Sequence, residues 1–203
     1  MIDTSASRPS RAASTASRSA REGLDAEVSI TDLLLIAVSA ALDEHPAFNA
    51  TFEDGVHRTY EEHNVGVAVD VEGGLVTPVV EGVDRRTIPE VAAERRRLTD
   101  RALSGSFTSD DLSGGTFTLS NLGIFDVDSF TPIINPPEVA ILGVSRVREV
   151  PVRDVEAGVA FDRRLRVDLS FDHRVVDGAD AARFLSTLAD RVADPWPLVV
   201  SRV

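Results

Sequence analysis

The sequence FDHRVVDG, at residues 171–178, separates a segment with the period of a β-strand from one with the period of a helix. Before it, every second residue is apolar, as in a half-buried strand: Leu165, Val167, Leu169 and Phe171. After it, apolar residues recur at helical spacing: Ala182, Leu185, Leu188, Ala189 and Val192. The alternation runs on to His173. We therefore expect this imidazole to project from the apolar face, just before a strand-to-helix turn.

Two residues of this stretch are candidates for chemistry. An imidazole on an apolar face could act as a general base, because desolvation favours its neutral, proton-accepting form. The alternative is a hydrogen-bonded core histidine, which is the commoner role of a lone histidine. Asp177 could orient the histidine, or it could simply cap the helix that follows. The pattern His-x-x-x-Asp-Gly fixes only three positions, so other segments must agree before it indicates a function.

Composition excludes several kinds of site. The 203 residues are 43% hydrophobic, which suits one substantial core. There is no cysteine, which excludes disulfides, thiolate metal sites and a cysteine nucleophile. All 21 basic residues are arginine, so Schiff-base chemistry and a lysine-attached lipoyl group on this chain are excluded too. The four histidines lack the spacing of metal ligands, so we expect no metal: His45, His57, His63 and His173.

Charge is distributed unevenly along the chain. The net charge is −12; residues 1–21 carry four arginines and one aspartate, or +3, which leaves −15 for the remainder. An acidic body argues against nucleic acid as a partner. An acid-rich surface without lysine also resembles those of proteins from a high-salt cytoplasm. No run reaches the ~20 apolar residues of a membrane span, and no secretory pattern is present, so we expect a cytoplasmic protein with no membrane partner.

Residues 1–23 are rich in Ser, Ala and Arg and are predicted to be a mobile arm, and residues 24–203 a single domain. Helices are predicted from Ser29 or Thr31 to about Glu44, from Thr87 to about Ser104, and over residues 179–193. The run Arg95-Arg96-Arg97 is interpreted as a solvated helix face. Strands are predicted over residues 47–53, 56–60, 64–71, 75–80, 116–121 and 138–150, and before His173. This mixture predicts an α/β fold, a two-layer sandwich whose mixed β-sheet is covered by helices.

Four blocks in the same order resemble one known family. They are Gly74 to Val80, Thr116 to Gly123, Phe130 to Val144, and His173 to Gly178. From about Leu24 to its end, the chain resembles the C-terminal catalytic domain of the dihydrolipoamide acyltransferase components of 2-oxo acid dehydrogenase complexes.

The resemblance implies a chloramphenicol acetyltransferase-like fold and a homotrimer with its active site in a channel between subunits. Coenzyme A and dihydrolipoamide would enter from opposite sides, with the lipoyl group supplied by another chain and the 2-oxo acid dehydrogenase components as partners. His173 would be the general base, Asp177 its polar neighbour, and Ser120 the hydroxyl that steadies the tetrahedral intermediate from an adjacent chain. Asn121 and Gly178 would line the substrate site.

The tail Leu198-Val199-Val200 is similar to the hydrophobic knob through which family trimers join into cubic or dodecahedral shells; alternatively, it packs on its own chain. The lipoyl and subunit-binding domains of the family are not found in the sequence, and only Ser19–Asp25 resembles the end of the first catalytic-domain helix. We therefore expect an N-terminally shortened domain. It would be an acyltransferase fed by another chain, a structural core of weak activity, or an acetyltransferase of a small hydroxylated substrate.

Overall fold

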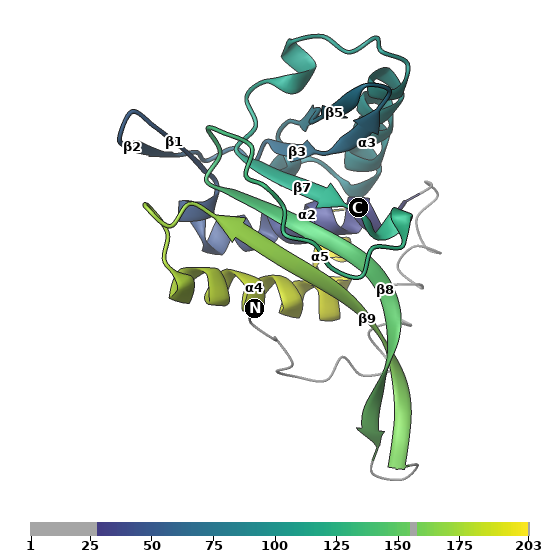
Figure 1. Ribbon diagram of the computed structural model, residues 1–203. Helices are drawn as coiled ribbons and strands as arrows, with labels where there is room; N and C mark the ends of the chain where they lie inside the picture. Colours follow the sequence, from purple (N-terminus) through teal and green to yellow (C-terminus); the bar gives the residue numbers. More distant parts are fainter. Residues whose placement is uncertain (1–27, 155–157, 203) are drawn as a thin grey trace.

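The computed structural model describes residues 28–154 and 158–202, and the predicted arm over residues 1–23 lies outside them. Its centre is a five-stranded mixed sheet in the order β6-β3-β7-β8-β9 (Figure 1). The strands are β3 (Val65–Val67), β6 (Val79–Val80), β7 (Phe117–Asn121), β8 (Ala140–Asp154) and β9 (Gly158–Phe171). Strands β3, β7 and β8 are parallel, while β6 and β9 run antiparallel at the two edges.

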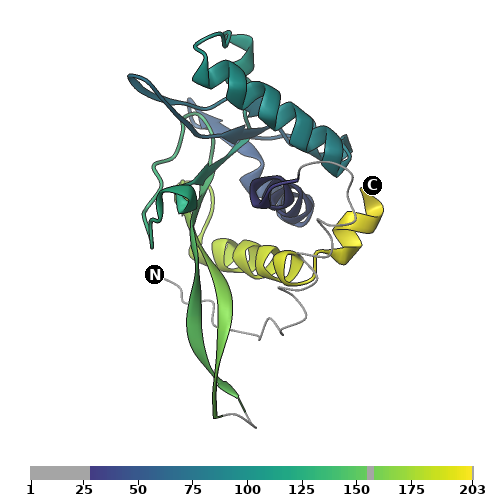
Figure 2. The ribbon, with the colours of Figure 1, turned by 90° about the vertical axis from the view of Figure 1, so that its right-hand side faces the viewer.

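Helices α2 (Ile30–Glu44), α3 (Ile88–Leu103) and α4 (Gly178–Ala193) lie on the same side of this sheet (Figure 2). Ser29 caps α2 in a reciprocal capping box with Asp32, and Thr87 does the same for α3 with Glu90. Helix α2 is apolar on most of its surface, because it is buried among the sheet and the other helices. The predicted two-layer α/β sandwich with a mixed sheet is confirmed.

The predicted hairpin at Asp54-Gly55 is confirmed. Strands β1 (Ala50–Glu53) and β2 (Val56–Thr59) pair directly across it, and both turn residues have positive φ, 52° and 77°. The predictions of single strands over 64–71 and 75–80 were wrong, because each segment breaks in two. Strands β4 (Val69–Val71) and β5 (Gly74–Val76) form a separate small sheet. Pro78, which has no N–H to donate, separates β5 from β6.

Strands β8 and β9 form a hairpin that runs well beyond the body of the molecule (Figures 1 and 2). Their register shifts between Val144 and Val147, and from there the two strands leave the sheet together. The remaining short elements are η1 (Pro46–Phe48), η2 (Val83–Arg85), η3 (Asp110–Leu112), η4 (Gly123–Phe125) and α5 (Trp196–Ser201).

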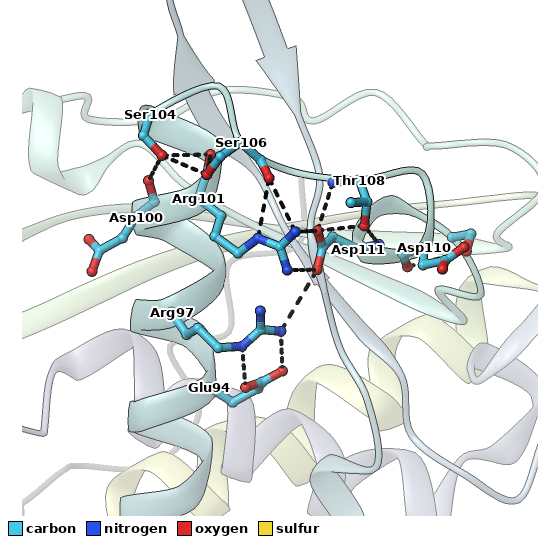
Figure 3. A network of polar contacts seen from close by, with 10 residues as sticks. Glu94, Arg97, Asp100, Arg101, Ser104, Ser106, Thr108, Asp110 and Asp111 are labelled. Carbon is cyan, nitrogen blue, oxygen red and sulfur yellow. Dashed lines mark hydrogen bonds and ion pairs between the residues drawn. The ribbon is translucent and has the colours of Figure 1, made fainter.

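The arginine run on α3 is not a solvated face, so that interpretation was wrong. The Arg95 side chain is 15% exposed and pairs with the fully buried Asp32 of α2, at 2.5 Å between Nε and Oδ1. Arg97 pairs with Glu94 on its own helix and with Asp111. Arg101 also binds Asp111 and the carbonyl oxygen of Ser106, so the segment after α3 is fastened back onto the helix (Figure 3).

The apolar C-terminal tail forms α5 and packs in part on its own chain. Val199 is buried in the core and Leu198 contacts it. The Ile88 amide donates to the Arg202 carbonyl oxygen at 2.9 Å. Val200 is 76% exposed, so one apolar side chain of the tail points outward.

Candidate active site

Ser120 lies at the carboxyl end of β7, on the outer face of the sheet. Phe117 and Leu119 are fully buried against the helices, so the alternation of the strand turns Thr118 and Ser120 to the opposite side. Ser120 is half-buried and stands in register with Gly143 of β8.

The loop after η4 crosses the outer face of the sheet at Gly143. A Cβ atom at Gly143 would come within 2.8 Å of the Phe130 ring and 3.1 Å of the Pro132 ring. The Ser170 hydroxyl donates to the Pro132 carbonyl oxygen at 2.6 Å, which ties this loop to β9. Only glycine lets the loop lie this close to β8, in register with Ser120.

Asn121, predicted to line the substrate site, uses its amide inside the chain. Its Nδ2 donates to the Thr31 hydroxyl at 3.1 Å, and its Oδ1 accepts from the Gly123 amide at 3.0 Å. Asn121 therefore fastens the end of β7 to the start of α2 and to the next turn.

His173 lies in the turn after β9 and not on the strand, so the prediction that it projects from the apolar face was wrong. Strand β9 ends at Phe171, because Asp172 starts a tight turn in which its carbonyl oxygen accepts from the Val175 and Val176 amides, both at 3.1 Å. The imidazole is exposed in this chain, and its ring centroid lies 5.5 Å from that of the Phe171 ring. No hydrogen bond to either ring nitrogen occurs among the described residues, which leaves both free for a substrate.

Asp177 caps α4. Its Oδ1 accepts from the Ala179 amide at 2.8 Å and from the Asp180 amide at 2.9 Å. The hydrogen bond from Asp180, aided by that from Ala179, lowers the pKa of Asp177 from its ordinary value. Gly178 is the first residue of α4, and a Cβ atom there would meet nothing within 4 Å.

Ser120 and His173 of one chain do not meet. Gly143 is in register both with Ser120 and with Asp168 of β9, and His173 lies five positions beyond Asp168. Two strand spacings and the rest of β9 put the two residues roughly 15 Å apart. Figure 1 shows the reason: β7 and β9 run in opposite directions, so their arrowheads lie at opposite ends of the sheet.

Glu138 is a buried carboxyl group that the sequence analysis missed. It is 5% exposed; its Oε2 accepts from the Thr118 hydroxyl at 2.5 Å and its Oε1 from the Asn135 amide at 3.3 Å. Burial raises the pKa of Glu138 to about 7, against the smaller opposing effects of those two hydrogen bonds. A charged residue at the head of the apolar run Val139 to Val144 was the available signal.

Within residues 28–154 and 158–202, no group of three histidine or acidic side chains could hold a metal ion. None of the helices in the same ranges is long and apolar enough to cross a membrane.

Comparison with solved structures identifies the fold. A crystal structure of Azotobacter vinelandii dihydrolipoamide acetyltransferase, concerned with the catalytic role of one serine, one histidine and one asparagine, matches with a TM-score of 0.81. It is 34% identical and covers 94% of this chain and 77% of that one. The cubic core of a pyruvate dehydrogenase multienzyme complex matches equally well, at 0.81, 35% identity and the same coverage. Chloramphenicol acetyltransferase shares the fold at 15% identity, with a TM-score of 0.57 over 94% of this chain and 98% of its own, as predicted.

Sequence comparison gives the family. The dihydrolipoyllysine-residue acetyltransferase component of the Haemophilus influenzae pyruvate dehydrogenase complex is 42% identical over 186 residues, which is 89% of this chain and 32% of that protein. The chain spans less than half the length of the curated relatives it matches. A family model described as 2-oxoacid dehydrogenases acyltransferase (catalytic domain) matches residues 3–200. The chain therefore belongs to the acyltransferase family of the 2-oxoacid dehydrogenases, as its catalytic domain.

Proposed function

We propose that this chain transfers an acyl group between coenzyme A and dihydrolipoamide by direct attack of one thiol on the other's thioester. Family membership supports the reaction class. The observation that carries the proposal is the His173 imidazole, exposed on a fixed turn with both ring nitrogens free of hydrogen bonds within the described chain. In the A. vinelandii protein the histidine and the asparagine are four positions apart, as His173 and Asp177 are here.

His173 supplies what the attacking thiol lacks. A thiol of pKa ~8.5 is mostly protonated at neutral pH, whereas the thiolate is the nucleophile, so a general base beside it removes the proton as attack begins. The thioester carbonyl becomes an oxyanion, and donation from the Ser120 hydroxyl lowers the barrier by about 3 kcal/mol. Collapse expels the second thiolate, which takes the proton back from His173. Acyl passes directly between the thiols, with no covalent enzyme intermediate.

Each active site takes Ser120 from one copy and His173 from the next. The roughly 15 Å between them within one chain supports this arrangement. A contact of this kind joins two different surfaces, and repeated contacts close into a ring. We therefore favour a homotrimer, and the cubic core formed by a relative supports assembly into a larger cubic or dodecahedral shell.

The remaining site residues have supporting parts in this proposal. Asp177 fixes the start of α4 behind His173, and the open space at Gly178 leaves room for a substrate beside the imidazole. Asn121 lines the site next to Ser120 through its backbone, because its side-chain amide is already hydrogen-bonded to Thr31 and Gly123. Residues 1–203 contain no lysine, so the lipoyl group is expected on a lipoyl-bearing domain outside them. The 2-oxo acid dehydrogenase components are the expected partners.

Complementation between two inactive variants tests the shared site. We expect His173→Ala to lower kcat for transfer from acetyl-CoA to dihydrolipoamide by about 10³-fold, and Ser120→Ala by about 10²-fold. Random co-assembly of the two, co-expressed with different tags, should restore about a quarter of wild-type activity, since one site in four then receives both intact residues. His57→Ala, a histidine on β2, is the matched control and should keep full activity and assembly size.

Three outcomes would contradict the proposal. Transfer that persists in His173→Ala would exclude the histidine as base. No activity in the co-assembled variants would place both residues in one subunit's site. A wild-type protein that assembles but transfers nothing to a thiol would instead be a structural core, or, if a substrate screen shows transfer to a hydroxyl, an acetyltransferase of hydroxylated compounds.

A further inference from the structure

The β1–β2 hairpin touches the turn that carries His173. Strand β2 is exposed along most of its length, whereas β1 contributes Ala50 to the core. Its partly buried aromatic residue, Phe52, lies under the Arg174 guanidinium, with 4.5 Å from the Arg174 Cζ to the ring centroid. A guanidinium over an aromatic face is an attractive contact.

Arg174 also binds Asp172, on the other side of His173. Its Nε lies 2.9 and 3.0 Å from the two Asp172 carboxylate oxygens, and its Nη2 lies 2.5 Å from Oδ2. The Arg174 amide donates to Asp172 Oδ1 at 3.0 Å. This guanidinium holds the pKa of Asp172 below its ordinary value. The two neighbours of His173 are thus joined to each other through side chain and backbone.

Phe52 is itself fixed to the same part of the molecule. Its amide donates to the Pro137 carbonyl oxygen at 2.8 Å, and the Val139 amide donates to the Ala50 carbonyl oxygen at 3.0 Å. On its other side, Val139 accepts a hydrogen bond at its carbonyl oxygen from the Asp172 amide, at 2.8 Å. Backbone hydrogen bonds therefore run from β1 through residues 137–139 to Asp172, and the Arg174–Phe52 contact closes this loop.

We infer that Phe52, Arg174 and Asp172 are positioning residues that hold the His173 imidazole in place for proton transfer. The inference rests on the proposed function. Arginine suits this task because its planar fork can bind a carboxylate with two nitrogens while its face lies on a ring. Lysine keeps the charge, but it has a single nitrogen and no planar face, so it cannot bind the carboxylate with two nitrogens and stack on the ring at once. A loosened turn misplaces the base, and a displacement of ~1 Å in a catalytic group can cost ~10²-fold in rate.

A double-mutant cycle on kcat tests the clamp. We expect Arg174→Lys to lower kcat for acyl transfer by about tenfold and Phe52→Leu by about fivefold, with KM for both thiol substrates within about twofold of wild type. The combined variant should be no slower than Arg174→Lys alone, because both changes break the same contact. An additive loss, or a loss confined to KM, would overturn the inference and make Arg174 a substrate-binding residue.

Arg183→Lys is the matched control. Arg183 pairs with Asp180 on α4, is exposed to a similar degree as Arg174, and has no ring contact among the described residues. Its lysine variant should retain wild-type kcat. Val56→Ala, at an exposed position of the same hairpin, should retain it as well.

Amide hydrogen exchange separates the clamp from the reaction. In Arg174→Lys and Phe52→Leu, exchange at Val175 and Val176, whose amides bind the Asp172 carbonyl oxygen, should speed up by about tenfold. Unchanged exchange at both positions overturns the clamp, whatever the activity. Faster exchange in the two variants, combined with a wild-type protein that assembles but transfers no acyl group, would support the clamp and reject the proposed function.

Discussion

At the scale of single residues, Glu138 offers the sharpest pH test. Its folded pKa of about 7 lies above the unfolded value of 4.5, so its contribution to stability is fully present below pH 4.5 and is lost as pH rises to about 7. The full cost above pH 7 is roughly 3 kcal/mol. We expect Glu138→Gln, which keeps the shape without the charge, to remove this loss and to be more stable than wild type at pH 8 in urea unfolding at one fixed protein concentration.

Glu90 is the control for that measurement. It is also a glutamate that accepts from a threonine, but it is exposed, and the amide and hydroxyl of Thr87 lower its pKa. Its contribution is present above the unfolded pKa and is lost as pH falls, so Glu90→Gln should be less stable than wild type at pH 7. Equal pH dependence of the stability of wild type and Glu138→Gln would show that burial does not raise the pKa of Glu138.

Residue chemistry could be predicted from the sequence only where it is local. The cap at Asp177 follows from the two positions after it, and the turn at Asp54-Gly55 follows from its own residues. The exposure of His173 could not be predicted, because the turn at Asp172 depends on an arginine that reaches back to it and on a ring from a distant hairpin. The roles of His173 and Ser120 stay predictions that rest on the family resemblance.

At the scale of elements, the ion pair between α2 and α3 makes a testable contribution to the free energy of unfolding. Arg95→Ala would leave the fully buried Asp32 carboxylate without its cation, and we expect a loss of about 3 kcal/mol in the free energy of unfolding. The double variant Asp32→Asn/Arg95→Ala should be less destabilised than Arg95→Ala, because no unpaired charge remains. Urea unfolding measures both.

Arg97→Ala, two positions along the same helix, is the comparison for Arg95→Ala. Arg97 is 46% exposed and pairs with Glu94 and Asp111, so its loss should cost less than ~1 kcal/mol. Equal losses for the two arginines would show that burial of the Arg95–Asp32 pair has no special effect.

Helices and the long strands could be predicted because caps and periodicity mark them locally, as at Ser29 and Thr87. The break at Ala68 could not, because it depends on which neighbour each half joins, whereas Pro78 marks the second break in the sequence itself. The Ala68 amide donates to the Leu119 carbonyl oxygen, whereas Val69 already pairs with Val76 in another sheet. The regular alternation of valines over residues 65–71 carries no mark of such a change of partner.

At the scale of the whole molecule, charge predicts a dependence on salt. From Asp43 to Asp84 there are ten acidic residues against one arginine, Arg58. At 0.1 M salt, with a Debye length of about 10 Å, these carboxylates repel one another, whereas at 1 M and about 3 Å they barely interact. We expect the assembly, followed by sedimentation velocity, to dissociate and transfer to stop as KCl falls from 2 M to 0.1 M. Sucrose at matched osmolality should not replace the salt. An assembly that is unchanged across this range would refute the high-salt interpretation.

The crossing at Gly143 limits how the surface beside Ser120 can be redesigned. Even a methyl group there collides with Phe130 and Pro132, so the loop would lift away and release its tie to Ser170. Libraries aimed at accepting bulkier acyl chains are therefore better focused on the loop residues, with that glycine kept constant. Among related sequences, we expect the loop residues to vary while the glycine at position 143 stays the same.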